Sequence, residues 1–173
     1  LDGKSITVKS PQDAIRQGIG LLTEDRKHQG LILGMSVREN TTLANLRSLV
    51  KFLFVNRAKE KQITSEFVRE LQIKTPHIEQ TAQNLSGGNQ QKVVLAKWLE
   101  IGPKVLLLDE PTRGVDVGAK HEIYELMNTW TNNGIERYSR ESTRADSLKS
   151  PDWRVRAQAL KDVATGKLRV DAA

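Results

Sequence analysis

The chain has 173 residues, of which 38% are hydrophobic and 28% are charged, and this composition is typical of a folded globular protein with its own core. It has no cysteine, which excludes disulfides and thiolate metal sites, and its longest apolar runs are far too short to cross a bilayer. The net charge of +6 comes from basic residues interleaved with acidic ones, so no dense basic block points to nucleic acid.

Hydrophobic periodicity and capping residues predict the elements in chain order. The first part of the chain is predicted to form short strands at residues 1–8 around an Asp-Gly turn, a helix from Ser10-Pro11 to Gly18, a buried strand at 19–22 and a polar loop at 23–30. A helix begun by a capping box at Ser36 and Glu39, a charged helix at about 57–71, a helix from Gly87 to Gly102, an apolar strand at 105–108 and a helix at about 117–130 are predicted to follow. The strand at 105–108 is apolar throughout, as in a central parallel strand covered on both faces. Strands alternating with helices predict an α/β sheet, with a mostly helical insert over about residues 35–100.

The first segment with chemical meaning is Ser86-Gly87-Gly88, which opens a helix. Glycines let the backbone approach a ligand closely, and the N–H groups at a helix N-terminus point toward an anion in front of them. Taken alone, these three residues are more simply a capped helix start. Followed by the sequence NQQK and by an acidic strand end, they favour a turn that meets phosphate.

The second segment is that strand end, where Asp109 and Glu110 directly follow the apolar strand. The carboxyl edge of an α/β sheet is where such sheets bind ligands. Asp109 would hold Mg²⁺, usually through water, and Glu110 would orient and polarise the attacking water. A strand running into an acidic surface turn is the alternative. Together with the glycine turn, the two carboxylates are two of the parts that hydrolysis of a nucleoside triphosphate requires.

These residues resemble the ATP-binding-cassette ATPases. Residues 85–91 look like the family signature, residues 105–110 like the Walker B strand with its catalytic glutamate, and residues 114–116 like the loop that follows. Further segments narrow the resemblance to the second cassette of bacterial monosaccharide importers, nearest to the ribose type: TEDRK at 23–27, LGMSVREN at 33–40, NQQK at 89–92 and PTRGVDVGAK at 111–120. The resemblance extends from residue 1 to about residue 134.

The resemblance implies a P-loop NTPase sheet in which two cassettes face each other and clamp ATP and Mg²⁺ between them. Ser86, Gly87 and Gly88, together with Gln90, would bind the nucleotide held by the facing cassette. Asp116 would lie in the loop at the interface between the two cassettes.

Glu24 takes the place of the γ-phosphate-sensing Gln of most family members, in keeping with the sugar subgroup. A carboxylate there would repel phosphate unless Mg²⁺ or a basic neighbour compensates for its charge. A solvated acidic residue in a loop is the other interpretation. The resemblance also implies membrane permease subunits as partners, a periplasmic sugar-binding protein as an indirect partner, no nucleic acid, and a peripheral position at the cytoplasmic face of the bacterial inner membrane.

The phosphate-cradling loop of such ATPases, G-x₄-G-K-[ST], is not found in the sequence. The residues GKS at 3–5 look like its tail, but the required earlier Gly is missing, and the β-branched residues at 6–8 suit a strand instead of a helix. We therefore expect a partial cassette over residues 1–134 that does not turn over ATP by itself. Residues 135–173 are polar and basic, without the Ile/Val-rich strand expected next, and are interpreted as a divergent tail with one helix beginning at Ser150-Pro151.

The sequence thus predicts the ATP-hydrolysing subunit, or a fragment of it, of an importer that powers uptake of a ribose-like monosaccharide. Two alternatives stay open. The chain could be an inactive remnant that acts only as a protein-interaction module, or a soluble cassette ATPase that acts on nucleic acid. The sugar itself is not specified, because in this family the periplasmic receptor and membrane subunits choose it.

Overall fold

The computed structural model describes residues 6–132 and 135–140 of the chain. The elements in chain order are α1 (Pro11–Arg16), β1 (Ile19–Leu22), the π-helical turn η1 (Arg26–Gly30), α2 (Val37–Thr42), the 3₁₀ turn η2 (Leu43–Asn45), α3 (Leu46–Leu49), β2 (Val50–Lys51), β3 (Phe54–Val55), α4 (Arg57–Glu70), the 3₁₀ turn η3 (Ala82–Asn84), α5 (Gly87–Leu99), β4 (Val105–Asp109), α6 (Val117–Asn132) and β5 (Glu136–Arg140).

Most predicted elements are present. The helix from Ser10-Pro11, the strand at 19–22 and the helix that Gly87 opens lie where capping residues and periodicity placed them. The predicted strand at the start of the chain is wrong over the part that the structure describes, because residues 6–9 are irregular there. Residues 1–5, the other half of that prediction, lie outside the described residues.

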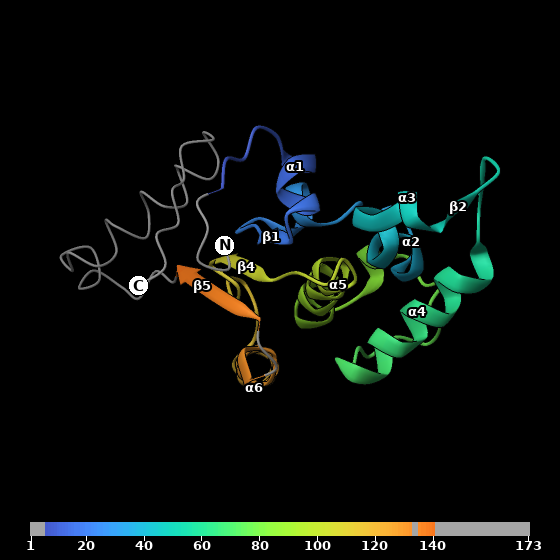
Figure 1. Cartoon of the computed structure of the whole chain (residues 1–173). Helices are drawn as coiled ribbons and strands as arrows, with labels where there is room; N and C mark the ends of the chain where they lie inside the picture. Colours follow the sequence, from blue (N-terminus) through green and yellow to red (C-terminus); the bar gives the residue numbers. More distant parts are fainter. Residues whose placement is uncertain (1–5, 133–134, 141–173) are drawn as a thin grey trace.

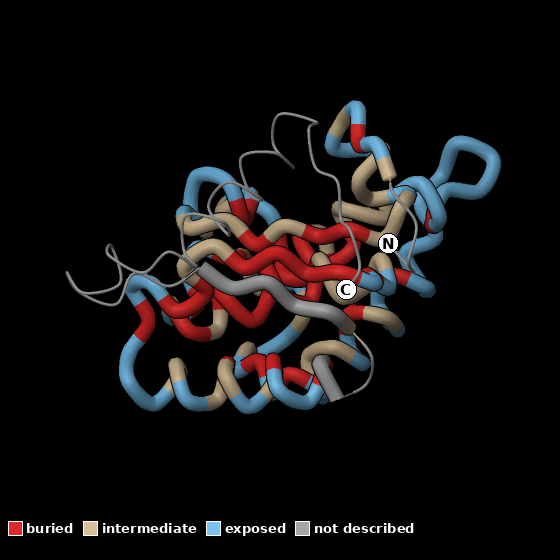
Figure 2. Tube along the Cα trace, turned by 60° about the vertical axis from the view of Figure 1, so that its left-hand side comes forward, coloured by how far each residue is buried: buried red, intermediate tan, exposed pale blue. Residues whose placement is uncertain are grey.

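The parallel sheet has the strand order β1-β4-β5, with Ile19 opposite Val105 and Leu22 opposite Leu108. Side chains alternate across β4: Leu106 and Leu108 pack into the larger core with α5 and α6, whereas Val105 and Leu107 join a smaller cluster on the other face. The prediction of a central apolar strand covered on both faces is therefore confirmed. Figure 2 shows buried positions concentrated at the centre of the molecule and exposed positions on its outer loops.

A strand after Gly134 was not predicted, because residues 135–140 are mostly polar. The structure places β5 there, parallel to β4, with Val105 opposite Glu136 and Asp109 opposite Arg140. The physical reason lies in β4, whose backbone N–H and C=O groups require partners on both sides when the strand is central. A polar neighbour can supply them as well as an apolar one. The helix predicted from Ser150 lies outside the described residues.

The helices cover the sheet from two sides. Figure 1 shows α1 on one side of the sheet and α6 on the other, with α5 between the sheet and the insert. The insert contains α2, α3, the short antiparallel pair β2–β3, and α4. The predicted capping box is confirmed at the start of α2: Ser36 Oγ accepts from the Glu39 amide, and the Glu39 carboxylate accepts from the Ser36 amide at 2.9 Å.

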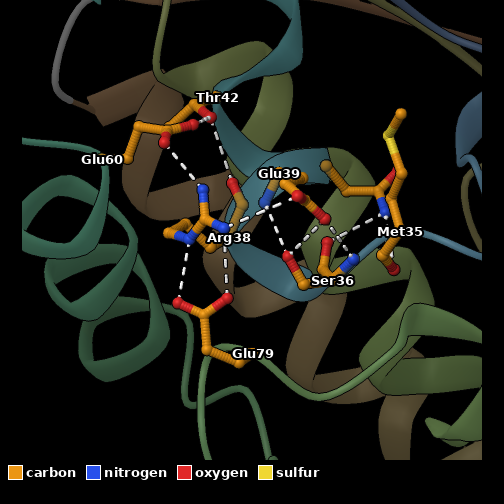
Figure 3. Close-up of polar contacts among 8 residues, drawn as sticks. Met35, Ser36, Arg38, Glu39, Thr42, Glu60 and Glu79 are labelled. Atoms are coloured by element: carbon orange, nitrogen blue, oxygen red, sulfur yellow. Dashed lines mark hydrogen bonds and ion pairs between the residues drawn. The ribbon is translucent and has the colours of Figure 1, made fainter. Parts of the chain in front are cut away.

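A buried guanidinium holds the insert together. Arg38 on α2 donates to Glu60 on α4 at 2.7 Å and makes two bonds to Glu79, at 2.9 and 3.1 Å (Figure 3). Glu60 also accepts from the Thr42 hydroxyl at 2.8 Å. Because Arg38 and Glu60 are almost fully buried, each charge depends on the other for its solvation. Arg38 therefore connects α2, α4 and the segment that leads back toward the sheet.

Candidate functional site

Ser86 begins α5 at the surface of the molecule. Its hydroxyl accepts from the backbone amide of Asn89 and, at 2.8 Å, from the Asn89 side-chain amide. The side-chain oxygen Oδ1 of Asn89 in turn accepts from the backbone amide of Lys74 at 2.7 Å, which connects the turn to the end of the insert. Ser86 is exposed, so the helix N-terminus opens toward solvent and not into packed protein. This placement gives an anion access to the helix N-terminus.

A cavity of about 290 Å³ lies in front of this turn, where the N-terminal ends of α5 and α6 meet. Its lining includes the sequence-predicted residues Ser86, Gly88 and Asp116. Two cations also line it: Lys74 is exposed, whereas Lys92 is buried and donates to Glu122 at 2.6 Å. Asp116 and Glu122 line it as well, so the side-chain charges balance, and it is the backbone N–H groups at the two helix ends that suit phosphate.

Asp116 supports the second of these helix ends. Its carboxylate accepts from the Ala119 amide at 2.9 Å, and its carbonyl oxygen accepts from the Lys120 amide, so it caps α6. The structure thus places Asp116 beside the glycine turn, on the wall of the same cavity. The sequence spacing gave no direct indication of this closeness, because about thirty residues separate the two segments in the chain.

Gly88 is the point of contact between α5 and α6. A Cβ atom at this position would lie 2.6 Å from the Cβ of Ala119, a distance that real Cβ atoms do not show. Ala119 has no flexible end that could move aside, so the two helices can approach this closely only because residue 88 has no side chain.

We expect Gly88→Ala to lower the free energy of unfolding by about 1–3 kcal/mol, as in other overpacked contacts. Urea unfolding monitored by circular dichroism measures the change. Gly34→Ala is the matched control, since a Cβ there meets nothing within 4 Å, and its effect should stay within about 0.5 kcal/mol. Equal stability of the two variants would show that the α5–α6 contact yields without cost.

The predicted acidic pair lies at the carboxyl end of β4. Asp109 is the last residue of the strand, and Glu110 follows it with φ of 49°, a left-handed conformation that is rare for a residue with a side chain. Both residues are half-buried. Strained conformations of this kind concentrate at functional sites, where the surrounding structure holds a side chain in a required direction. Neither carboxylate lines the cavity in front of Ser86, so the acidic strand end and the glycine turn are not parts of one pocket in this chain.

The donor set at this strand end fits Mg²⁺. Among residues 6–132 and 135–140, no three His, Cys, Asp or Glu side chains are gathered as a self-sufficient metal site. Mg²⁺ does not require one, because it commonly uses one or two carboxylates and completes its shell with phosphate oxygens and water. Asp109, the residue predicted to hold the ion, supplies a hard oxygen ligand at the sheet edge where ligands bind.

Arg26 is a functional candidate that the sequence did not single out. Its guanidinium donates to the carbonyl oxygens of Arg113 at 2.7 Å and Gly114 at 3.0 Å, and its Nε donates to Gln90 at 3.4 Å. A Cβ on Gly87 would lie 2.8 Å from this guanidinium, so the glycine leaves room for it. Arg26 therefore contacts the glycine turn, the signature helix and the loop after β4 at once.

Glu24 and Gln90 are held by these same neighbours. Glu24 forms an ion pair with Arg113, so a basic group does lie beside this carboxylate. Gln90 is 4% exposed, and its side-chain amide donates to Ala82 O at 3.1 Å while its carbonyl oxygen accepts from Arg26. It lies beneath the glycine turn and not on its open side. Its contact with the site passes through Arg26.

The polar loop predicted at residues 23–30 contains a regular turn. Residues Arg26–Gly30 form a π-helical turn, and the Asp25 carboxylate caps it by accepting from the amides of Lys27 and His28. The hydrogen bond between the Asp25 carboxylate and the His28 ring, together with these two backbone bonds, lowers the pKa of Asp25. The turn fixes the direction from which Arg26 reaches the glycine turn.

Comparison with known proteins decides the family. The ABC transporter family profile matches residues 1–113, which is well over half of the chain. The chain belongs to the ABC transporter family. Its place in that family is that of the ATPase domain, and the predicted fold class, an ABC cassette of the P-loop NTPase type, is confirmed.

Relatives of this ABC transporter chain include sugar-import proteins. It is 53% identical over 135 residues to the ribose import ATP-binding protein RbsA of Bacillus licheniformis and 55% identical over 135 residues to the xylose import ATP-binding protein XylG of Thermoanaerobacter pseudethanolicus. In both cases the match covers 78% of this chain and 27% of the relative. The chain thus spans about a quarter of the length of these curated relatives.

Solved ABC cassettes share its fold. The dimeric post-hydrolysis state of an ATP-binding cassette bound to ADP and Pi superposes with a TM-score of 0.63 at 20% identity, covering 79% of this chain and 58% of the other. A second ABC transporter cassette gives 0.64 at 22% identity, with 82% and 57% covered. In the described part of this chain, no helix has the length and apolar character that crossing a bilayer requires.

Proposed function

We propose that this chain is the ATP-binding and ATP-hydrolysing part of a bacterial importer for a monosaccharide such as ribose. The observation that carries the proposal is the similarity to ribose and xylose import ATP-binding proteins over 78% of the chain. The glycine turn, which opens a helix onto a surface cavity, supports it. The inactive remnant and the nucleic-acid ATPase are less well supported, because the named relatives are import proteins and the acidic strand end is in place.

The glycine turn receives the nucleotide of a facing cassette. Ser86, Gly87 and Gly88 donate hydrogen bonds from the hydroxyl and the first backbone amides of α5 to the terminal phosphate. Gln90 supports the turn from below through Arg26. Asp116, beside the same cavity, lies at the interface between the two cassettes.

The strand end would act on a nucleotide whose phosphates are cradled by a G-x₄-G-K-[ST] loop, a motif that the printed sequence does not contain. Asp109 would hold Mg²⁺, and the ion would supply positive charge that offsets the charge developing on the phosphates. Glu110 accepts a hydrogen bond from the attacking water and aligns it with the terminal phosphorus. Glu24 would face the same nucleotide, and its ion pair with Arg113 offsets its charge.

The proposed partners are a facing ABC cassette, the membrane permease subunits and, indirectly, a periplasmic sugar-binding protein, with no nucleic acid. This arrangement places the chain at the cytoplasmic face of the bacterial inner membrane as a peripheral subunit. ATP binding draws the two cassettes together, because the phosphate is bound by groups from both.

Nucleotide-dependent association tests the proposal. We expect Ser86→Glu to reduce MgATP-dependent binding between this chain and a cassette that carries a phosphate-cradling loop by at least about tenfold, since a carboxylate would then face the phosphate. Analytical ultracentrifugation with and without MgATP gives the measurement. Ser65→Glu adds the same charge on the exposed face of α4 and serves as the control. Association that is insensitive to Ser86→Glu would contradict the role of the glycine turn.

A further inference from the structure

A short hairpin carries the two most exposed large apolar side chains of the described residues, Leu53 and Phe52. The strands β2 and β3 pair antiparallel, with Lys51 opposite Phe54, and a two-residue turn of Phe52 and Leu53 joins them. Phe52 is 86% exposed, Leu53 95% and Phe54 79%. Figure 1 shows the hairpin projecting from the insert beyond α3 and the start of α4. We call Phe52, Leu53 and Phe54 the apolar tip.

The backbone conformation of this turn disfavours the bulky side chains that it carries. Phe52 has φ of 48° and Leu53 has φ of 71°. A two-residue hairpin turn with positive φ at both positions favours Asn-Gly, because bulky side chains are strained there. Water also disfavours large apolar groups at full exposure. Two independent costs therefore fall on one turn, which indicates that the apolar tip has a role outside the folding of this chain.

The surroundings of the apolar tip carry charge of one sign. Within residues 47–61, all described, the exposed charged side chains are basic: Arg47, Lys51, Arg57, Lys59 and Lys61. Glu60, the acidic residue of this segment, is 3% exposed and is bound to Arg38 and Thr42 inside the insert. The Lys51 ammonium lies 5.9 Å from the centre of the Phe52 ring. These cations lie on both sides of the apolar tip along the chain: Arg47 on α3, Lys51 on β2, and the other three in the first turns of α4.

We propose that the apolar tip inserts into the headgroup region of an anionic lipid bilayer, with the five flanking cations against the lipid phosphates. A narrow, convex projection penetrates a fluid interface readily, whereas it offers little area to a flat protein partner. Interfacial binding strengthens with buried apolar area and with attraction between basic residues and anionic lipid. The apolar tip and its basic flank supply both contributions. This inference goes beyond the proposed role in ATP hydrolysis and does not use the nucleotide site.

Vesicle flotation tests the inference with the full chain. We expect binding to vesicles of phosphatidylcholine mixed equally with phosphatidylglycerol, and much weaker binding to pure phosphatidylcholine. The double variant Phe52→Asn, Leu53→Gly places the favoured turn residues in the hairpin, so it keeps the fold while removing two apolar side chains. It should bind the mixed vesicles at least about tenfold more weakly. Circular dichroism confirms that the variant is folded.

Two further variants separate the contributions. Lys51→Glu with Lys59→Glu should abolish the preference for phosphatidylglycerol, because reversed charges repel the anionic surface. Val117→Asn removes an apolar side chain that is 85% exposed on α6, away from the hairpin, and should leave binding unchanged. Full binding by the Asn-Gly variant would overturn the proposal. So would failure of the native chain to bind mixed vesicles while its apolar tip binds detergent-solubilised membrane subunits, since the partner would then be a protein.

Discussion

Replacing Glu110 by Gln is expected to lower the ATPase turnover of the assembled importer by roughly 10²–10⁴-fold, the usual contribution of a positioned general base. The amide keeps the size of the side chain but cannot polarise the attacking water. The left-handed backbone at this residue already fixes the direction of the side chain, so the substitution removes the charge and not the geometry. Release of phosphate by the reconstituted importer, measured at saturating MgATP, gives the turnover number.

Binding of MgATP should persist in the Glu110→Gln variant, because the phosphates are held by other groups. The nucleotide-bound, associated state of the cassettes should therefore accumulate. Glu125→Gln is the matched control, since it makes the same chemical change on the exposed face of α6. Turnover that is reduced equally by both substitutions, or by neither, would refute the role of Glu110 as the water-orienting carboxylate.

Arg38→Ala is expected to lower the free energy of unfolding by about 3–5 kcal/mol, the cost of leaving a buried charge without its partner. Glu60 would keep one hydrogen bond, from Thr42, and lose the guanidinium that solvates it. Glu79 would lose both bonds that fix the segment after α4. Urea unfolding curves followed by circular dichroism measure the loss through the midpoint.

The exposed residue Arg69 on α4 provides the control, and Arg69→Ala should change the stability by less than about 0.5 kcal/mol. The pH dependence adds a second readout. The bond from Arg38 lowers the pKa of Glu79, so this contribution is complete above the pKa of an unfolded Glu and is lost as the pH falls through the lowered value. The difference between native chain and Arg38→Ala should therefore shrink in acid. A loss below about 1 kcal/mol at neutral pH would show that Arg38 does not stabilise the insert.

Local signals in the sequence located most of the fold. The caps at Ser10, Ser36 and Ser86 act through side-chain bonds to amides a few residues on, so a short stretch of sequence contains the whole cause. The apolar run of β4 likewise predicts its own central position. The strand β5 was missed because its pairing arises from the needs of β4 and not from its own composition.

For the candidate site, the sequence likewise allowed the local motifs to be predicted but not their tertiary contacts. The glycine turn and the acidic strand end are recognisable from adjacent residues, whereas their neighbours are not. Arg26 reaches Gln90 across 64 residues and Gly114 across 88, and no periodicity within one segment encodes such contacts. The steric reason for Gly87, room for a guanidinium, likewise depends on the tertiary structure.

The polar contacts of Arg26 form a closed ring that returns to its own segment of the chain. Its guanidinium grips the backbone of Arg113, and the side chain of Arg113 returns to Glu24, two residues before Arg26. Because Gln90 of α5 is bonded to Arg26, a phosphate that displaces the glycine turn must either break these contacts or move the segment after β1 with it. Phosphate binding at the turn would thus be coupled to the position of Glu24 through a few polar contacts, without any rearrangement of the sheet.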